Sequence, residues 1–353
     1  MNEIAAITGV DLFCGVGGLT YGLQKVGVDI VAGVDIDAAC AYPYETNNKS
    51  RFIERDIATL DPSELSNLFP PTGLKLLAGC APCQPFSTYS RSGRGRHDES
   101  MSPLLLSFGR LIEDVQPDLI TMENVPQILH HAVFQGFLES LGGYYTWWSI
   151  IECSAVGVPQ RRKRLVLLAS KLGPEDLHLT TTRFQQRTVR DTIGSLPPID
   201  AGGVLAEDPL HVASRLSELN MERIRASRPG GTWRDWPVSL QADCHRRSTG
   251  ATYPSVYGRM SWDEPAPTIT TQCFGYGNGR FGHPEQDRAI SLREAAMLQT
   301  FPRSYAFAPR HAKIKFNRLG RLIGNAVPVR LGEVIGKALT RHVRANAGTG
   351  AGS

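Results

Sequence analysis

Short apolar runs alternate with amphipathic runs through the first half of this 353-residue chain. The apolar runs predict buried strands, and they cover residues 7–13, 30–34, 74–78, 119–122 and 165–169. An apolar stripe from Leu104 to Val115 predicts a helix over 104–116, with Ser102 as its N-cap and an end before Pro117. Strands that alternate with helices build a mainly parallel sheet wrapped by helices. The sequence therefore predicts an α/β fold.

The composition and the hydrophobic periodicity of the sequence change near residue 180. From there to about 316 it is rich in Gly, Pro, Arg and aromatic residues, with few sustained periodic runs. We therefore expect a first domain over 1–180 and a second, smaller domain of irregular or β-rich structure over 181–317. Periodicity returns over 319–339, and the small polar residues 346–353 predict a flexible tail.

The composition is that of an ordinary globular protein, with 41% hydrophobic and 20% charged residues. The sequence has no apolar stretch of membrane-spanning length, and its first residues do not resemble a signal peptide. Seven cysteines, an odd number, do not suggest a disulfide framework, so we expect a cytoplasmic protein. A net charge of +4 and a pI near 8.7 permit a polyanionic partner without demonstrating one.

A glycine-rich turn follows the first predicted strand, where Gly15, Gly17 and Gly18 let a cofactor approach the backbone. The dinucleotide-binding fingerprint would place another glycine at position 20, where this chain has Thr20. Asp35 lies about twenty residues after the turn, where a carboxylate can bind ribose hydroxyls. A plain tight turn would look similar, but with Asp35 the pattern favours a nucleoside-cofactor site. It does not distinguish NAD from S-adenosylmethionine.

A thiol and a carboxylic acid follow the next two predicted strands. Cys83 stands in a Pro-Cys-Gln-Pro run, and Glu123 stands in a Met-Glu-Asn-Val run. Such a pair suits attack on an electron-poor ring, because a soft nucleophile adds to carbon while the acid hydrogen-bonds a ring nitrogen. Cys80 and Cys83 also form a Cys-x-x-Cys pair, which leaves a redox site as an alternative. A metal site would need a second ligand pair at suitable spacing, and the sequence has none.

Basic residues gather at three places that suit phosphate binding. They are the run 160–164, the glycine- and arginine-rich stretch 91–97, and the stretch 245–262, where arginines mix with aromatic residues. Each of these could instead be a solvated surface or part of a core.

Taken in order, these elements resemble the cytosine-C5 DNA methyltransferase family, from about residue 9 to residue 340. The matching motifs are the glycine turn 11–18, Pro82-Cys83-Gln84, Glu123-Asn124-Val125, the pattern of Gln160, Arg162 and Arg164, the run 288–299, and the run 324–328. The resemblance implies a Rossmann-like S-adenosylmethionine-dependent methyltransferase fold, in which residues 318–345 return to the catalytic domain. It also implies that 181–317 form a target-recognition domain.

The resemblance implies that S-adenosylmethionine lies across the glycine turn and that no metal is needed. The implied cofactor-binding residues are Phe13, Gly15, Gly17, Gly18, Asp35, Ile36, Asp56, Ile57, Pro82, Leu104, Asn325 and Val327. Phe13 and Ile36 would contact adenine, Asp35 the ribose, and Asp56 the adenine amino group. The family often has Glu at the position of Asp35 and an aromatic residue at that of Ile36.

The resemblance further implies that the target cytosine is flipped out of the duplex. Cys83 would add to C6, Glu123 would hydrogen-bond N3 and the amino group, and Arg162 and Arg164 would hold phosphate and the base carbonyl. The residues expected to contact DNA are Gln84, Ser87, Arg91, Asn124, Gln160, Arg246, Arg247 and Arg259. We expect a monomer that acts on double-stranded DNA. A cognate restriction endonuclease, if there is one, would act on the same DNA sequence but would not form a complex with this protein.

Three other functions remain open at this point. An RNA methyltransferase would use the same catalytic residues, although the long region 181–317 favours a DNA-reading domain. A thiol–disulfide oxidoreductase would use Cys80 and Cys83 but would explain neither Glu123 nor Asn325. A non-catalytic nucleic-acid binder would not need the full set of catalytic residues.

Overall fold

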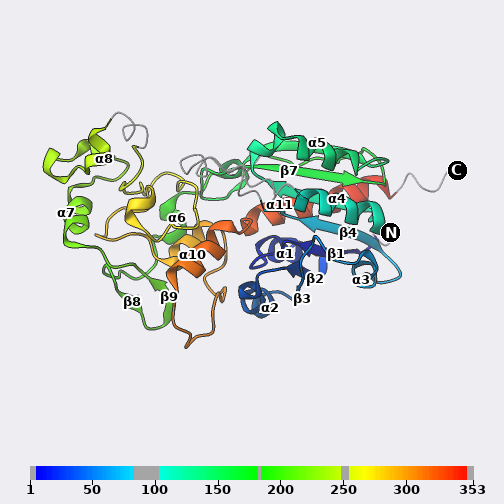
Figure 1. The fold of residues 1–353 in the computed structure, drawn as a ribbon, viewed down its shortest axis with the longest axis horizontal. Coiled ribbons are helices and arrows are strands. Elements are labelled where there is room, and N and C mark those ends of the chain that lie inside the picture. Colours follow the sequence, from blue (N-terminus) through cyan, green and yellow to red (C-terminus); the bar gives the residue numbers. More distant parts are fainter. Residues whose placement is uncertain (1–4, 83–102, 182–183, 248–253, 348–353) are drawn as a thin grey trace. The chain divides into compact units, whose positions relative to one another are not determined.

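The computed structural model of the protein describes residues 5–82, 103–181, 184–247 and 254–347 (Figure 1). Contacts within the chain divide it into two compact units. Unit 1 contains Met1–Val156, Lys163–Arg183 and Val327–Ser353, and unit 2 contains Gly157–Arg162 and Phe184–Ala326. Both units are therefore discontinuous in sequence.

Unit 1 is built on a seven-stranded sheet with the strand order β3-β2-β1-β4-β5-β7-β6. The strands are β1 (Ile7–Leu12), β2 (Asp29–Asp35), β3 (Arg51–Glu54), β4 (Leu74–Gly79), β5 (Leu119–Asn124), β6 (Tyr145–Glu152) and β7 (Lys163–Ser170). The first five strands in the sheet order are parallel, whereas β7 is antiparallel to both β5 and β6. The predicted α/β fold is confirmed, although the predicted strands include neither β3 nor β6, and the reversed direction of β7 is not predicted.

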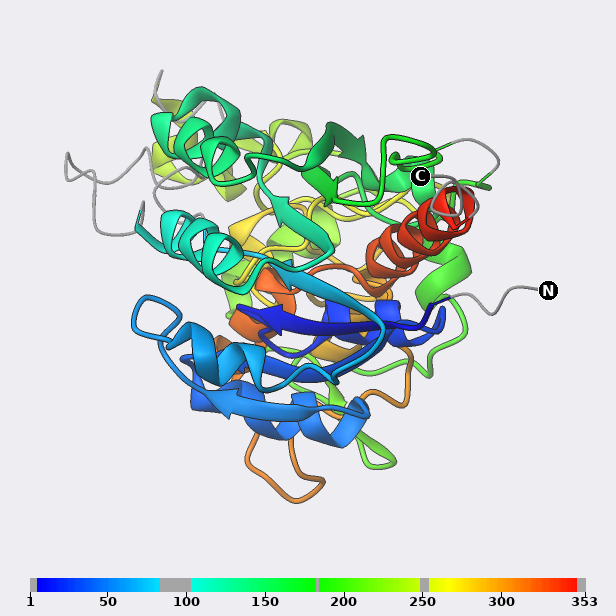
Figure 2. The same cartoon turned by 90° about the vertical axis from the view of Figure 1, so that its right-hand side faces the viewer.

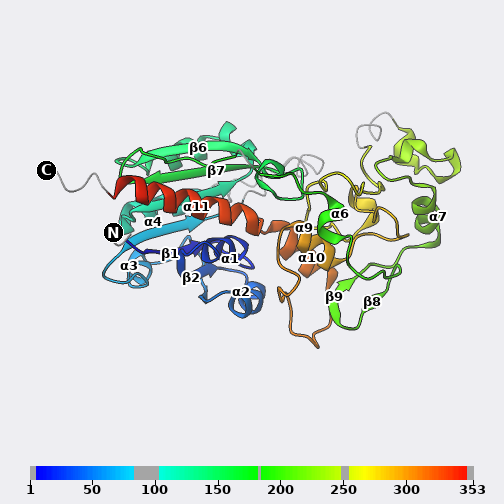
Figure 3. The same cartoon turned by 180° about the vertical axis from the view of Figure 1, so that it is seen from behind.

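Helices cover both faces of this sheet, as the opposite views of Figures 1 and 3 show. One face packs against α3 (Pro62–Ser66), α4 (Pro103–Val115) and α5 (Ala132–Glu139) through a core that includes Leu12, Leu77, Phe108 and Phe137. The other face carries α1 (Gly18–Gln24) and α11 (Val329–Asn346). The shorter elements of this unit are α2 (Ala41–Asn47) and the 3-10 turns η1 (Ala38–Cys40), η5 (Pro126–His130) and η6 (Cys153–Val156). Within the described residues, no helix is long and apolar enough to cross a membrane.

The C-terminal helix α11 packs closely against α1. A Cβ on Gly22 would lie 2.8 Å from the Cα of Gly332, so the missing side chain lets the two backbones approach each other. Lys25, which follows α1, forms an ion pair with Glu333 of α11 at 2.5 Å. Segments from the two ends of the sequence are therefore neighbours in unit 1, as the blue and red ribbons of Figure 2 show.

Unit 2 is largely irregular. Of the two forms expected for the second domain, irregular or β-rich, the structure therefore confirms the irregular one. Its elements are α6 (Val189–Ile193), β8 (Val204–Leu205), β9 (Asp208–Val212), α7 (Glu218–Ala226), η7 (Trp233–Asp235), η8 (Val238–Leu240), α8 (Asp243–Arg246), η10 (Tyr276–Asn278), α9 (Leu292–Leu298) and α10 (Phe316–Asn325). Only β8 and β9 pair as strands among its described residues, so the unit is not rich in β-structure. It is held by an aromatic core with Trp233, Trp236 and Tyr276 and by a buried ion pair between Arg288 and Glu294.

The chain returns to unit 1 at Val327, whereas the return is predicted at residue 318. The helix α10 stays with unit 2 because it lies directly on neighbouring backbone. A Cβ on Gly320 would lie 2.8 Å from the carbonyl oxygen of Thr271, and one on Gly324 would lie 2.5 Å from its nitrogen. Asn346, the first residue of the predicted tail, is the last residue of α11 and is buried. Residues 348–353 lie outside the described residues.

Candidate active site

The sheet of unit 1 reverses its strand order between β1 and β4. Open α/β sheets bind ligands at the carboxyl ends of the strands beside such a reversal. The glycine turn follows β1 and Pro82 follows β4, so both predicted motifs begin at this place. Four predicted site residues after Pro82 lie outside the described residues, and they are Cys83, Gln84, Ser87 and Arg91.

The turn after β1 has three residues with left-handed backbone. Phe13, Gly15 and Gly17 have φ angles of 56°, 52° and 83°. A Cβ on Gly17 would lie 2.9 Å from the ring of Tyr44, so this side of the turn is tightly packed. A Cβ on Gly15 would meet no described atom within 4 Å. The turn therefore leaves open space beside Gly15, where a ligand can reach the backbone.

Asp35 holds the glycine turn from the end of β2. Its Oδ2 accepts a hydrogen bond from the N–H of Gly15 at 2.9 Å, and its Oδ1 accepts one from the N–H of Asp37 at 2.9 Å. Burial raises the pKa of the Asp35 carboxyl, and the backbone donors oppose this rise. Each oxygen keeps a lone pair for a further donor. The adjacent Ile36 is 66% exposed, so it offers an apolar surface at the same strand end.

Other predicted cofactor residues lie near β3, β4 and α4. Asp56 and Ile57 follow β3, which pairs with β2. The Oδ1 atom of Asp56 accepts the N–H of Ala58 at 2.9 Å, and Ile57 is buried. Pro82 and Leu104 are half-buried.

A buried chain of hydrogen bonds lies next to the glycine turn, and the sequence does not predict it. The Oγ1 of Thr20 donates to Asp11 Oδ2 at 2.7 Å and lies 3.1 Å from the hydroxyl of Tyr44, which lies 3.0 Å from Ser50 Oγ. Burial raises the pKa of Asp11 to about 7, against the lowering effect of the Thr20 hydrogen bond. The other oxygen of Asp11 has no hydrogen-bond partner in the described part of the chain. The signal in the sequence is Thr20 itself, which departs from the dinucleotide fingerprint.

Glu123 and Arg164 are brought together by the pairing of β5 with β7. Glu123 lies opposite Val166, two residues from Arg164, so both side chains project from the same face. Arg164 Nε lies 2.8 Å from Glu123 Oε1, and both side chains are largely shielded from solvent. No N–H is aligned with this oxygen, which has an ion-pair partner but no hydrogen-bond donor among the described residues. A ligand with a suitable donor would satisfy it.

Asn124 ties the end of β5 to the segment that follows β4. Its Nδ2 donates to the carbonyl oxygen of Ala81 at 3.1 Å, and its Oδ1 accepts the N–H of Val125 at 2.8 Å. The side chain is buried, and backbone groups engage both of its polar ends. Asn124 therefore positions the chain just before Pro82, and its predicted contact with DNA stays a prediction.

The environment of Cys80 opposes the redox alternative. Burial and the nearby Glu123 carboxylate raise the pKa of this thiol well above its ordinary value. The attacking cysteine of a redox pair needs a lowered pKa, because the thiolate is the reacting species. These surroundings therefore do not suit Cys80 as the attacking thiol.

Three predicted site residues of unit 2 are buried, and they are Gln160, Arg162 and Arg259. Gln160 donates to Gln299 Oε1 at 2.9 Å and accepts the N–H of Ile269 at 2.8 Å. Arg162 donates to the carbonyl oxygens of Ile269 at 3.1 Å and of Gly324 at 3.4 Å. These contacts direct both side chains to the interior of the unit.

Arg259 has an equally internal place. Its guanidinium donates to four carbonyl oxygens, those of Ile224, Ser227, His283 and Gln286, and it pairs with Asp287. In contrast, Arg246 and Arg247 are exposed at the end of α8. Asn325 is exposed at the end of α10, and Val327 is buried in unit 1.

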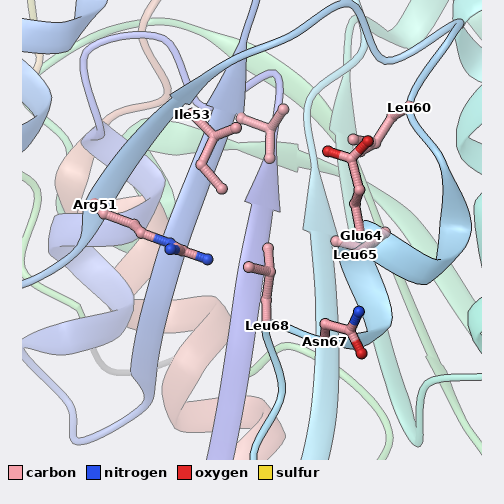
Figure 4. A pocket seen from close by; sticks show the side chains of 8 residues that line it. Arg51, Ile53, Leu60, Glu64, Leu65, Asn67 and Leu68 are labelled. Atoms are coloured by element: carbon pink, nitrogen blue, oxygen red, sulfur yellow. The ribbon is translucent and has the colours of Figure 1, made fainter.

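A pocket of about 350 Å³ also lies in unit 1 (Figure 4). It is lined by Val34, Arg51, Ile53, Leu60, Glu64, Leu65, Asn67 and Leu68. Val34 and Leu65 belong to the core on the α3 side of the sheet, whereas Asp35 alternates to the opposite face. None of the predicted site residues lines this pocket. No described cluster of His, Cys, Asp or Glu could hold a metal ion.

Comparison with known proteins gives matches over nearly the whole chain. A family model described as C-5 cytosine-specific DNA methylase matches residues 7–341. The type II methylase M.HgiDII of Herpetosiphon aurantiacus is 54% identical over 340 residues, which cover 95% of each chain. The type II methyltransferase M.Eco47II of Escherichia coli is 30% identical over 347 residues, which cover 94% of this chain and 78% of that one.

Solved structures share the fold. A candidate DNA modification methyltransferase encoded within an E. coli prophage superposes with a TM-score of 0.74 at 22% identity, covering 96% of this chain and all of the other. The Entamoeba histolytica methyltransferase EhMeth superposes with a TM-score of 0.64 at 14% identity, covering 96% of this chain and 99% of the other.

Proposed function

Because the chain belongs to the C-5 cytosine-specific DNA methylase family, we propose that it methylates C5 of a cytosine within one specific sequence of duplex DNA. The family makes it a DNA (cytosine-5-)-methyltransferase, and the proposal concerns its substrate and mechanism. The observation that carries the mechanism is the shielded Glu123–Arg164 pair, in which one carboxyl oxygen has no aligned donor.

The residues around the glycine turn suit S-adenosylmethionine, which supplies an electrophilic methyl group when bound. The open space beside Gly15 admits a ligand, Asp35 offers lone pairs to ribose hydroxyls, and Ile36 offers an apolar surface to adenine. We keep the other residues implied by the family resemblance in the proposed set, and they are Phe13, Gly17, Gly18, Asp56, Ile57, Pro82, Leu104, Asn325 and Val327.

We assign activation of the target base to Cys83 and Glu123. The thiolate of Cys83 adds to C6 of a flipped cytosine, and the ring electrons shift toward N3. The carboxylic acid of Glu123 donates a hydrogen bond to N3, and its Oε1, which has no other hydrogen-bond donor among the described residues, accepts one from the amino group of the base. C5 then takes the methyl group, water removes the C5 proton, and the bond between C6 and sulfur breaks to release Cys83. Arg164 orients the Glu123 carboxyl and offsets negative charge that develops on the base.

We assign recognition of the DNA sequence to unit 2. Residues 157–162 and 184–326 carry 21 Lys and Arg against 13 Asp and Glu, whereas the rest of the chain carries 17 against 21. The positive charge is therefore concentrated in unit 2, as suits a unit that contacts phosphates. Arg246 and Arg247 are exposed there and stay in the proposed set of DNA contacts.

The direct test supplies labelled S-adenosylmethionine with a mixed-sequence duplex DNA and, separately, with RNA. We expect label in duplex DNA only, and bisulfite sequencing should place it at cytosines within one sequence. Label in RNA without label in DNA would favour the RNA alternative. Exchange of residues 184–326 for the matching part of a relative with another specificity should move the methylated site. If the hybrid still marks the original site, unit 2 does not read the sequence.

A further inference from the structure

The chain between α9 and α11 contains a basic stretch without acidic residues. From Ala295 to Gly332 it has seven Lys and Arg and no Asp or Glu. Five of these cations have exposed side chains and no ion pair among the described residues, and they are Arg303, Arg310, Lys313, Lys315 and Arg318. We name residues 303–318 the basic segment. It belongs entirely to unit 2, and no family motif quoted above includes it.

The first part of the basic segment is anchored by buried aromatic residues. The ring of Phe301 lies 4.6 Å from that of Tyr305 and 5.1 Å from that of Phe307, measured between centroids, and all three residues are buried. Arg293 of α9 donates to the carbonyl oxygen of Tyr305 at 2.9 Å, and it also pairs with Asp208 at 2.7 Å. The loop therefore has a fixed inner side while its cations are exposed.

The last part of the basic segment is the start of α10. The ring of Phe316 lies 5.4 Å from that of Phe274, and Leu319 is buried, whereas Arg318 between them is exposed. The close approach of Gly320 to neighbouring backbone fixes this helix in the unit. In Figures 1 and 3 the segment forms the orange loop that projects from unit 2 before α10.

We infer that the basic segment binds phosphates of duplex DNA. A run of exposed cations with no acidic residue between them in the sequence favours a positive potential that attracts a polyanion, whereas an ordinary surface mixes both signs of charge. Because aromatic contacts fix both ends of the loop, its backbone needs less ordering when the cations contact phosphates. Contacts of this kind orient a protein on DNA without reading bases. The inference rests on the proposed function, and it adds a surface that the sequence motifs do not assign.

The test compares the salt dependence of DNA binding. The variant with Arg310→Gln, Lys313→Gln and Lys315→Gln should bind duplex DNA more weakly. The slope of log affinity against log salt should become shallower by roughly three, about 0.9 for each lost phosphate contact. The methylated sequence and the affinity for S-adenosylmethionine should stay the same. A matched control changes Lys49, Arg51 and Lys337 to Gln, which are exposed cations of unit 1. Its slope should equal that of the wild type.

An unchanged slope in the segment variant, or an equal change in the control, would overturn the inference. A changed methylation site would overturn it as well, because the segment would then read bases. Arg303→Gln with Arg318→Gln repeats the test if the triple variant fails to fold, with an expected change in slope of about two. Failure of the wild-type protein to methylate DNA would refute the proposed function itself, whereas these outcomes concern only the segment in an active enzyme.

Discussion

At the scale of single residues, the proposed chemistry depends on the Glu123 carboxyl. Glu123→Gln keeps the size of the side chain and removes the acid, so we expect the methyl-transfer rate to fall roughly a hundredfold or more. The affinity for S-adenosylmethionine should scarcely change, because Glu123 is not part of the glycine turn. Single-turnover kinetics and equilibrium binding measure the two quantities. Glu139→Gln, at an exposed position, is the control. Near-normal turnover of Glu123→Gln would contradict the assigned role.

Thr20 is the residue on which the hydrogen-bond chain below the glycine turn depends. Thr20→Val removes the donor from Asp11 and leaves a buried carboxyl without its 2.7 Å hydrogen bond. We expect the free energy of unfolding to fall by about 1–3 kcal/mol. Tyr44→Phe leaves that bond intact and should cost less. Urea unfolding measures the loss of unfolding free energy in both variants, provided that the m-value is unchanged. Equal losses in the two variants would show that the hydrogen bond from Thr20 to Asp11 does not account for the effect.

At the scale of elements, the close crossing of α1 and α11 connects the end of the chain to the glycine turn. Gly22→Ala would place a Cβ 2.8 Å from Gly332, and we expect a loss of about 1–3 kcal/mol in unfolding free energy. The affinity for S-adenosylmethionine should fall too, since α1 begins at Gly18 of the turn. Gly142→Ala, whose Cβ would be 3.6 Å from its nearest neighbour, is the control. Calorimetric titration with S-adenosylmethionine measures the affinity. An unaltered affinity in Gly22→Ala would show that the crossing has no effect on the glycine turn.

The strands that the sequence predicts are those buried on both faces. The strand β3 is not predicted because its four residues begin and end with charged side chains. The strand β6 does carry a signal, because it is rich in aromatic and β-branched residues, and that composition could have predicted it. The reversed direction of β7 leaves no local pattern, since it depends on pairing with distant strands. The proximity of Glu123 to Arg164 follows from that pairing. The sequence motif therefore predicts Glu123 as a site residue, but only the register of the sheet shows that Arg164 is its ion-pair partner.

At the scale of the whole molecule, the division into two units separates residues that are adjacent in sequence. Arg162 belongs to unit 2 and donates to its carbonyl oxygens, whereas Arg164 belongs to unit 1. The sequence motif assigns one role to both arginines, because a motif carries no information on where the chain passes between units. The internal place of Arg259 has another origin, since its carbonyl partners lie within unit 2 but 24 to 35 residues away in the sequence.

Two buried titratable groups of unit 2, His283 and Glu294, make its stability sensitive to acid. Burial lowers the pKa of His283 to about 4. Burial opposes ionisation of Glu294, but hydrogen bonds and the charge of Arg288 outweigh it and lower its pKa to about 2. The unfolded chain therefore binds more protons than the folded one, and stability falls as the pH drops from 6.5 to 4 through His283 and from 4.5 to 2 through Glu294.

For His283 alone, the expected loss between pH 7 and pH 4 is roughly 3 kcal/mol. His283→Asn keeps an acceptor for the N–H groups of Glu285 and Gln286 but cannot take up the proton. Its stability should therefore vary less over this pH range. Denaturant unfolding followed by tryptophan fluorescence at several pH values measures the difference. An identical pH profile for wild type and variant would contradict the assignment to His283.

The central claim, that Cys83 attacks C6 of a cytosine in duplex DNA, is tested most directly with a duplex whose target cytosine carries fluorine at C5. After methyl transfer such a base has no C5 proton to lose, so Cys83 cannot be released and stays bonded to the DNA. We predict a covalent complex that requires S-adenosylmethionine, that mass spectrometry maps to Cys83, and that Cys80→Ser forms but Cys83→Ser does not. Attachment at Cys80, or methylation of normal DNA by Cys83→Ser, would contradict the account.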